Sequence, residues 1–292
     1  MKIHIAGNGA WGKALFFVIS KNTKDVSFWN RGEIIGKETD VLVLAVPTNA
    51  IRNVLSFINT KNIPIIINAS KGIEEVSHKL PFQIVEEVLG KEVEYFSLMG
   101  PGFSQEVLKK APTLLNLGYI KDSKVENIKR LFETPHFRIH ETNNIKALEL
   151  AGAFKNIYAI VSGFSNGLGY KLNTSSMLLV IAIEELQKLC GKLEFGVDFK
   201  SLPGVIGDLI LTCNSEKSRN FTFGSLLTEK SVSDSLKQVE QTVEGYYATS
   251  SVGYFEKLSG TNLPLASLVK EIIRLESPKE RKRRFVEFVK AV

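Results

Sequence analysis

The chain has 292 residues, of which 44% are hydrophobic and 23% are charged, and its formal net charge is +6. This balance is typical of a folded protein of about two domains, and no apolar run approaches the roughly 18 residues of a membrane span. The two cysteines, Cys190 and Cys213, show no pairing pattern and are expected to be core thiols. The positive charge suits an anionic ligand, and the basic cluster at residues 279–284 is interpreted as a solvated helix face rather than a nucleic-acid-binding arm.

The first segment, MKIHIAGNGAWGKAL, contains glycines at GxGxxG spacing. Residues 1–6 are expected to form a buried strand and residues 11–20 a helix, so the motif falls at a strand-to-helix junction. There Gly7 would allow a tight turn, Gly9 would let a pyrophosphate approach the backbone, and Gly12 would let helix and strand pack closely. The motif indicates a dinucleotide site, with a glycine turn that binds no ligand as the alternative.

Strands and helices alternate over the first half of the chain. Strands are expected at residues 25–29, 41–47, 64–70, 94–100, 113–120 and 136–142, with helices at 47–58 and 78–90. This alternation predicts a parallel sheet with helices on both faces. The second half has helical patterns at residues 144–164, 175–190, 204–213, 221–229, 266–275 and 279–291. We predict an α/β fold in which an N-terminal Rossmann-like parallel-sheet domain (1–142) precedes an all-helical C-terminal domain (143–292), with a cleft between them.

Lys155 is the first candidate for chemistry. It lies in LELAGAFKNIYAI next to the small residues 151–153, and a lysine in apolar surroundings can exchange a proton with a substrate hydroxyl or carbonyl. A surface lysine whose stem packs on apolar neighbours is the alternative. Asp208 and Thr212 are four residues apart on one helix face, so a carboxylate and a hydroxyl together could orient this lysine and a substrate oxygen.

Two other places carry cations. Lys71 follows the predicted strand 64–70, at the carboxyl edge where ligands bind in parallel sheets. Ser218, Arg219 and Asn220 form a candidate phosphate clamp, because arginine offers a planar fork of donors and the other two add neutral ones. Each feature alone is more often a helix cap or a surface pair, so the interpretation depends on their joint occurrence. The four histidines are scattered, and no metal site is predicted.

Over nearly its whole length the chain resembles bacterial NAD(P)-dependent glycerol-3-phosphate dehydrogenases. The matching segments occur in order: GNGAWGKAL, AVPTNAIR, ASKGIE, GPGFSQEV, ELAGAFKNIYAIVSG, GDLILTCNSEKSRN and VEGYYAT. AGAFKN and GDLILTC with SRN are the most diagnostic. The resemblance implies reversible hydride transfer between dihydroxyacetone phosphate and glycerol 3-phosphate, which supplies glycerol 3-phosphate for phospholipid synthesis. It also implies a cytoplasmic homodimer without a nucleic-acid partner.

The resemblance further implies roles for particular residues. Lys155 matches the proton donor and acceptor. The residues matching substrate contacts are Lys71, Gly100, Asp208, Ser218, Arg219 and Asn220. Those matching cofactor contacts are Gly7, Gly9, Ala10, Trp11, Gly12, Arg31, Lys71, Ser104, Arg219 and Glu244.

The chain departs from the family pattern in the GPGF segment and after the second strand. Gly102 stands where serine or threonine is usual, and Ser104, where alanine is usual, could replace the lost hydroxyl. Residues 31–40 replace several dozen residues that family members usually carry. About nine residues span about 30 Å when extended but only about 13 Å as a helix, which is too short for a crossover along a strand of about 17 Å. We predict an extended or loosely turned connection, a sheet that is shortened at the second-strand edge, and a more open adenosine pocket.

The sequence allows alternatives for the preferred cofactor and for the function. The second strand ends in Trp29, Asn30 and Arg31, with no carboxylate before Glu33, which favours NADPH over NADH. Arg31 could instead stack on adenine. The alternative functions are another two-domain dehydrogenase, acting on a hydroxy acid such as 3-hydroxyisobutyrate or 6-phosphogluconate, and a cofactor-binding protein without catalysis that serves as a redox sensor or structural partner.

Overall fold

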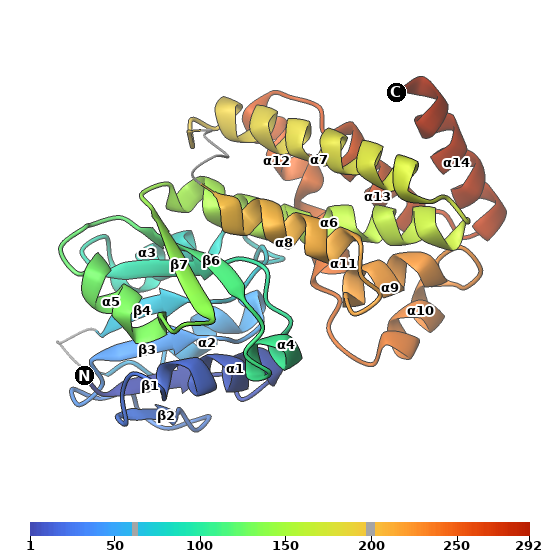
Figure 1. The fold of residues 1–292 in the computed structure, drawn as a ribbon. Coiled ribbons are helices and arrows are strands. Elements are labelled where there is room, and N and C mark those ends of the chain that lie inside the picture. Colours follow the sequence, from blue (N-terminus) through green and yellow to red (C-terminus); the bar gives the residue numbers. More distant parts are fainter. Residues whose placement is uncertain (60–63, 197–201) are drawn as a thin grey trace. The chain divides into compact units, whose positions relative to one another are not determined.

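The computed structural model describes residues 1–59, 64–196 and 202–292, and the chain divides into two compact units (Figure 1). Unit 1 comprises Met1–Glu149 and Asp198–Gly207, and unit 2 comprises Leu150–Val197 and Asp208–Val292. Unit 1 contains a seven-stranded sheet with helices, whereas the regular structure described in unit 2 is helical. The predicted fold class is therefore confirmed.

The sheet of unit 1 has the strand order β2-β1-β3-β4-β5-β6-β7. Its strands are β1 (Ile3–Ala6), β2 (Val26–Phe28), β3 (Val41–Leu44), β4 (Ile65–Asn68), β5 (Tyr95–Met99), β6 (Thr113–Tyr119) and β7 (Phe137–Thr142). The helices between them are α1 (Ala10–Ile19), η1 (Thr48–Ala50), α2 (Ile51–Leu55), α3 (Pro81–Leu89), α4 (Ser104–Leu108) and α5 (Val125–Phe132). The central strands are short runs of branched apolar residues such as VLVL in β3, which is buried throughout, as expected when both faces are covered.

The strand directions correct one prediction. Strands β1 to β5 are parallel, but β6 is antiparallel to β5, and β7 is parallel to β6. The register pairs Phe96 with Tyr119 and Met99 with Asn116. Between β5 and β6 the only helix is α4, whose five residues rise about 7.5 Å, whereas β5 extends about 17 Å. The chain therefore stays at the carboxyl edge of β5 and enters β6 from there.

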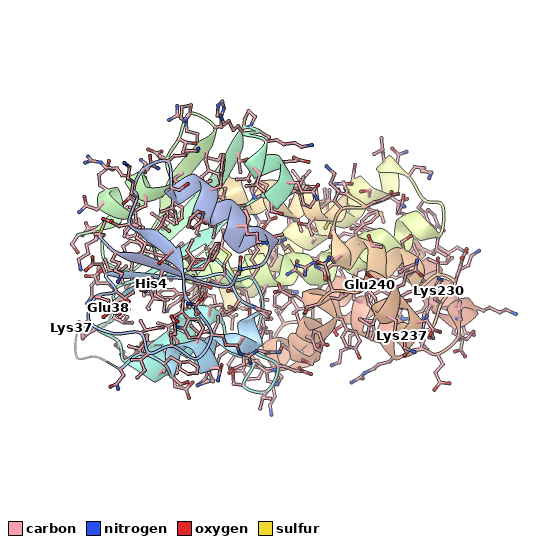
Figure 2. All side chains as sticks on the ribbon, turned by 90° about the horizontal axis from the view of Figure 1, so that it is seen from below. His4, Lys37, Glu38, Lys230, Lys237 and Glu240 are labelled. Carbon is pink, nitrogen blue, oxygen red and sulfur yellow. The ribbon has the colours of Figure 1, made fainter. Side chains whose placement is uncertain are left out.

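The short connection from β2 to β3 is a loosely turned path without a helix, as predicted, with turns at residues 31–32 and 37–38. Residues 31–40, all of them described, contain no helix, and β2 is the edge strand of the sheet. Ile35 is 1% exposed and its N–H donates to Phe57 O at 2.8 Å. Figure 2 shows Lys37 and Glu38 of this connection near His4, whose Nδ1 lies 2.9 Å from Thr39 Oγ1. These contacts hold the connection against the sheet without a crossover helix.

Unit 2 is built from helices. They are α7 (Leu172–Lys192), α9 (Arg219–Leu226), α10 (Val232–Val239), α11 (Glu244–Ala248), η3 (Thr249–Ser251), α12 (Val252–Ser259), α13 (Pro264–Arg274) and α14 (Pro278–Ala291). Helices α6 (Ile145–Gly167) and α8 (Pro203–Cys213) contribute residues to both units. Cys190 and Cys213 are buried free thiols, as predicted. No helix in the described part of the chain is long and apolar enough to cross a bilayer.

The interpretation of the basic cluster at residues 279–284 is wrong for one position. Arg281 is 1% exposed, and burial lowers its pKa. Its Nε donates to Leu275 O at 2.8 Å, and its Nη1 donates to Leu227 O at 3.1 Å and to Lys230 O at 2.7 Å. This guanidinium satisfies carbonyl groups at the ends of two helices, Leu227 and Lys230 after α9 and Leu275 after α13, where they lack helical partners. The neighbouring cations of the cluster are exposed or half-buried, as predicted.

Candidate active site

The glycine turn between β1 and α1 has the geometry of a pyrophosphate site. Gly7 has a φ of +117°, and a Cβ there would lie 2.3 Å from Ala45 O. A Cβ on Gly12 would lie 1.9 Å from Gly7 O. A Cβ on Gly9, by contrast, would meet nothing within 4 Å. The first and third glycines are therefore required by packing, while the second leaves the backbone open to a ligand, as the sequence predicts.

The N-terminus of α1 offers donors at this turn. Helix α1 begins at Ala10, and its N-cap, Gly9, supplies no side-chain hydrogen bond. The first helical bond of this turn runs from Lys13 N to Gly9 O at 3.0 Å. The amides of Ala10 and Trp11 are thus among the N–H groups that a helix cannot satisfy internally. Together with the positive end of the helix dipole, they suit an anionic ligand.

Trp11 explains the unusual glycine in the GPGF segment. A Cβ on Gly102 would lie 2.8 Å from Cη2 and Cζ3 of the Trp11 ring. The indole therefore lies where a serine or threonine side chain would begin. Trp11 Nε1 is buried and has no hydrogen-bond partner among the described residues. Ser104, the first residue of α4, is half-buried.

Lys71 connects the loops that follow β4 and β5. Its Nζ donates to Gly100 O at 2.7 Å. A Cβ on Gly100 would lie 2.8 Å from Leu115 Cα, so the β5 loop passes directly against β6. Both predicted substrate-side residues of unit 1 are therefore in contact at the carboxyl edge of the parallel strands.

Lys155 lies in a buried polar cluster of unit 2. On α6 its side chain is 5% exposed, while Asp208 and Thr212 on α8 are 4% and 6% exposed. Lys155 Nζ donates to Thr212 Oγ1 at 2.9 Å and lies 3.2 Å from Asp208 Oδ1. The Thr212 hydroxyl in turn donates to Asp208 Oδ1 at 3.3 Å. The predicted orientation of the lysine by these two residues is therefore present, and the alternative of a surface lysine does not hold.

This cluster leaves a donor for a substrate. An ammonium group has three N–H donors, and among the described residues Lys155 Nζ contacts only Thr212 and Asp208. The carboxylate compensates the buried positive charge, and the hydroxyl fixes the direction of the side chain. The remaining N–H can meet an oxygen of a bound molecule.

Glycines bring the phosphate-clamp residues close to α6 within unit 2. A Cβ on Gly163 of α6 would lie 1.9 Å from Phe221 O, and a Cβ on Gly224 of α9 would lie 1.9 Å from Ile160 O. Helices α6 and α9 thus touch backbone to backbone. This contact fixes the N-terminus of α9 relative to the helix that carries Lys155.

The residues of the SRN segment have different surroundings. Ser218 is the N-cap of α9, and its Oγ accepts from Phe221 N at 3.3 Å. Arg219 is exposed, and its guanidinium forms no ion pair or hydrogen bond with the described residues. Asn220 is 8% exposed and its Oδ1 accepts from Gly245 N at 2.9 Å. Arg219 is therefore the member of the segment that is available to an anion.

Asn156 is a residue that the sequence analysis missed. Its Oδ1 accepts from Asn220 Nδ2 at 2.9 Å, and its Nδ2 donates to Glu244 Oε2 at 3.3 Å. A Cβ on Gly245 would lie 2.3 Å from Asn156 O. Asn156 thus joins two predicted site residues to the helix that carries Lys155. A polar residue directly after Lys155 in a buried stretch was the available signal.

Arg31 follows β2 in an exposed turn. Arg31 is exposed and forms no ion pair or hydrogen bond with the described residues. Glu33, the first carboxylate after β2, accepts from Asn30 Nδ2 at 2.8 Å. Trp29 Nε1 donates to Glu33 O at 2.9 Å. The turn therefore holds the carboxylate at Asn30 and leaves the guanidinium of Arg31 available.

The predicted site residues are divided between the two units. The set of unit 1 comprises Gly7, Gly9, Ala10, Trp11, Gly12, Arg31, Lys71, Gly100 and Ser104. The set of unit 2 comprises Lys155, Asp208, Ser218, Arg219, Asn220 and Glu244. A hollow of about 380 Å³ in unit 1, between the end of α1 and the start of β7, is lined by none of them.

A strand–turn–helix suited to a pyrophosphate and a buried lysine held by a carboxylate and a hydroxyl define a dinucleotide-dependent dehydrogenase. Family models described as the C-terminus and the N-terminus of NAD-dependent glycerol-3-phosphate dehydrogenase match residues 144–281 and 33–125. The chain belongs to this family.

Individual relatives agree with this assignment. A glycerol-3-phosphate dehydrogenase (NAD(P)+) of Oceanobacillus iheyensis is 31% identical, with 93% of this chain and 89% of that protein covered. The corresponding protein of Staphylococcus haemolyticus is 30% identical, with 95% of each covered. A crystal structure of glycerol-3-phosphate dehydrogenase from Coxiella burnetii has a TM-score of 0.85 over 98% of both chains, and at 24% identity it supports the fold.

The buried pair of Lys155 and Asp208 generates a stability prediction. Asp208→Ala is expected to lower the free energy of unfolding by about 3 to 5 kcal/mol, because it leaves a buried ammonium without its counter-charge. In the Lys155→Met background the same change should cost much less. Urea unfolding of the single and double variants measures the difference. Glu287→Ala, which removes the exposed partner of Arg283 within α14, is the control and should stay within about 0.5 kcal/mol. Equal losses from Asp208→Ala in both backgrounds would contradict the coupling.

Proposed function

We propose that the protein is an NAD(P)-dependent sn-glycerol-3-phosphate dehydrogenase that interconverts dihydroxyacetone phosphate and glycerol 3-phosphate. The observation that carries this proposal is the Lys155–Asp208–Thr212 cluster, a buried ammonium with a compensating carboxylate and one N–H donor left over. A surface lysine would lack this environment. Membership of the dehydrogenase family supplies the substrate class.

The glycine turn supports cofactor binding. The open space at Gly9 and the uncapped start of α1 fit a pyrophosphate, so Gly7, Gly9, Ala10, Trp11 and Gly12 would hold it. When bound, NAD(P) supplies or takes up the hydride at C2 of the substrate. The remaining proposed cofactor contacts are Arg31, Lys71, Ser104, Arg219 and Glu244.

Lys155 is proposed to move the proton. In the reductive direction its Nζ donates a proton to the C2 oxygen as negative charge develops there, and in the oxidative direction the neutral amine accepts it. Asp208 stabilises the ammonium form, and Thr212 keeps the side chain directed. Lys71, held on Gly100 O, adds a second positive charge on the substrate side.

The start of α9 is proposed to hold the substrate phosphate. Arg219 offers a guanidinium fork with no partner among the described residues, and the first amides of α9 add donors at the positive end of the helix dipole. Ser218 and Asn220 flank it, with Asn220 fixed through Asn156 and Gly245. A phosphate here would be bound by charge and by preorganised N–H groups.

The proposal also covers the roles of the two domains, the location of the enzyme and its oligomeric state. Residues 1–142 would bind the dinucleotide and residues 143–292 the substrate. The enzyme would act in the cytoplasm as a homodimer and supply glycerol 3-phosphate for phospholipid synthesis. Neither a metal nor a nucleic acid enters the proposed reaction.

A substrate panel tests this function. With reduced cofactor, dihydroxyacetone phosphate should be turned over, and absorbance at the nicotinamide band should fall. Dihydroxyacetone should give a kcat/KM at least about 10²-fold lower, because the phosphate-binding groups are then left unpaired. With oxidised cofactor, 3-hydroxyisobutyrate and 6-phosphogluconate should give no turnover. Cofactor binding without turnover of dihydroxyacetone phosphate would contradict the enzyme assignment, and turnover of a hydroxy acid would favour a different dehydrogenase.

Arg219→Ala tests the phosphate site. It should raise the KM for dihydroxyacetone phosphate by about tenfold or more, because hydrogen bonds to a charged group contribute about 1.5 to 3 kcal/mol. Turnover of unphosphorylated dihydroxyacetone should change much less. Arg283→Ala removes an exposed arginine paired with Glu287 on α14 and is the control. Equal losses with both substrates would mean that Arg219 does not hold the phosphate.

Arg31→Ala tests the proposed preference for NADPH. In the parent protein, kcat/KM for NADPH should be at least equal to that for NADH. The variant should lose about tenfold with NADPH and little with NADH, as expected for one charge-assisted hydrogen bond to the 2′-phosphate. Lys37→Ala, an exposed cation of the same connection, should change neither value appreciably. A clear preference of the parent for NADH would overturn this assignment.

A further inference from the structure

Glu149 is a buried carboxylate that the proposed reaction does not use. It lies on α6 in unit 1 and is 1% exposed. One carboxylate oxygen accepts from Phe82 N, near the start of α3, at 2.8 Å. The other accepts from the Tyr95 hydroxyl on β5 and from Asn68 Nδ2 at 3.2 Å. Three elements of unit 1 therefore direct donors at one side chain.

Asn68 connects Glu149 to the loop after β4, because it also forms hydrogen bonds with the backbone of Ser70. Its Nδ2 also donates to Ser70 O at 3.1 Å, and its Oδ1 accepts from Ser70 N at 2.9 Å. The side chain of Asn68 thus holds both backbone groups of residue 70. Ser70 Oγ in addition donates to Leu44 O at 3.2 Å. The next residue is Lys71, whose Nζ reaches Gly100 O.

We propose that Glu149 is a positioning residue that sets the Lys71 loop through Asn68. The proposal rests on the proposed function in one respect, because it takes Lys71 to contact the substrate or cofactor. Glu149 fixes the rotation of the Asn68 amide, and this amide fixes the backbone of residue 70. The direction in which Lys71 leaves the loop depends on both.

The contacts of Glu149 favour its ionised form, which accepts hydrogen bonds only. Asn68 Nδ2 from β4 and Phe82 N from α3 cannot accept, so a protonated carboxyl could donate only to the hydroxyls of Tyr95 and Ser97 on β5, and the bonds from Asn68 and Phe82 need an acceptor oxygen. No cation among the described residues pairs with Glu149. Burial raises its pKa to about 7. Below that pH the carboxyl group is protonated, and the hydrogen bond from Asn68 weakens. Above that pH the carboxylate accepts the hydrogen bonds from Asn68, Phe82 and Tyr95.

Unit 2 contains a matched control. Glu185 on α7 is also buried, and it accepts from the Tyr158 hydroxyl at 3.1 Å and from backbone amides at the start of α13, including Ala266 N at 3.2 Å. Burial raises its pKa to about 7 as well. It forms no hydrogen bond with a residue of the proposed site. Glu185→Gln therefore shows the effect of losing a buried glutamate that caps a helix, and Glu149→Gln adds to this the loss of the link to Lys71.

The kinetic test compares kcat/KM for dihydroxyacetone phosphate between pH 5.5 and 8.5 in the parent, Glu149→Gln and Glu185→Gln. The ratio of parent to Glu149→Gln should rise by about tenfold between pH 6 and pH 8, since misplacement of a reacting group by about 1 Å can cost up to 10². The ratio of parent to Glu185→Gln should be flat, and ionisation of the substrate cancels in both ratios. In the Lys71→Met background Glu149→Gln should have no further effect. Equal effects of both glutamine substitutions, or an undiminished effect without Lys71, would overturn the proposal.

A second measurement needs no activity. The backbone amide resonances of Ser70 and Lys71 should titrate with an apparent pKa near 7 in the parent, should still do so in Glu185→Gln, and should not in Glu149→Gln. If Glu149→Gln does not fold, Asn68→Ala replaces it, because it leaves the bonds of Glu149 to Phe82 and Tyr95 in place. Resonances that do not titrate in the parent would contradict the inference. Resonances that titrate while Lys71→Met retains full kcat/KM would instead contradict the proposed role of Lys71.

Discussion

The buried ion pair between Lys155 and Asp208 is the interaction on which the rest of unit 2 depends. An ammonium in a residue that is 5% exposed is tolerated only with a counter-charge and hydrogen bonds, so α6 and α8 must be placed so that Lys155 Nζ and Asp208 Oδ1 meet, and these atoms are 3.2 Å apart. The glycines of α6 and α9 then allow backbone contact, which holds the phosphate-clamp segment against the same helix. The packing of unit 2 thus fixes the position of the Lys155 ammonium, the group that we propose transfers the proton.

Unit 1 depends on a comparable constraint at the carboxyl edge of its sheet. Packing of Gly7 and Gly12 fixes the β1–α1 turn, while the Asn68 amide fixes the loop that carries Lys71. The two units also share a local arrangement. In each, a buried glutamate, Glu149 or Glu185, accepts hydrogen bonds from a tyrosine hydroxyl and from the backbone at the start of a helix that begins with proline, α3 or α13. In unit 1 this arrangement connects through Asn68 to the loop of Lys71, whereas in unit 2 it stabilises the packing of α7 against α13.

The site was more predictable from the sequence than the fold around it. Spacing placed Asp208 and Thr212 on one helix face, because helical periodicity is local, while their contact with Lys155, 57 positions from Thr212, was a hypothesis that depended on the joint occurrence of the candidate residues. The short length of the segment at residues 31–40 excluded a crossover helix. The reversed direction of β6 was missed, because alternating strands and helices do not encode direction when the connecting helix is short. Helix α10 was missed because its apolar stripe is short, consisting of Val232, Leu236 and Val239, and none of these three residues is fully buried. The burial of Arg281 and the links of Asn156 depend on residues more than 50 positions away, which no local pattern reveals.

The central claim is that Lys155 moves the proton while other residues bind the cofactor, and Lys155→Met tests it most directly. Steady-state turnover of dihydroxyacetone phosphate and the affinity for reduced cofactor, measured by fluorescence titration on the same preparation, should separate. Turnover should fall by at least about 10², the usual effect of losing a general acid or base, while the cofactor Kd stays within about twofold of the parent value. Turnover within a few-fold of the parent, with cofactor binding intact, would contradict the account.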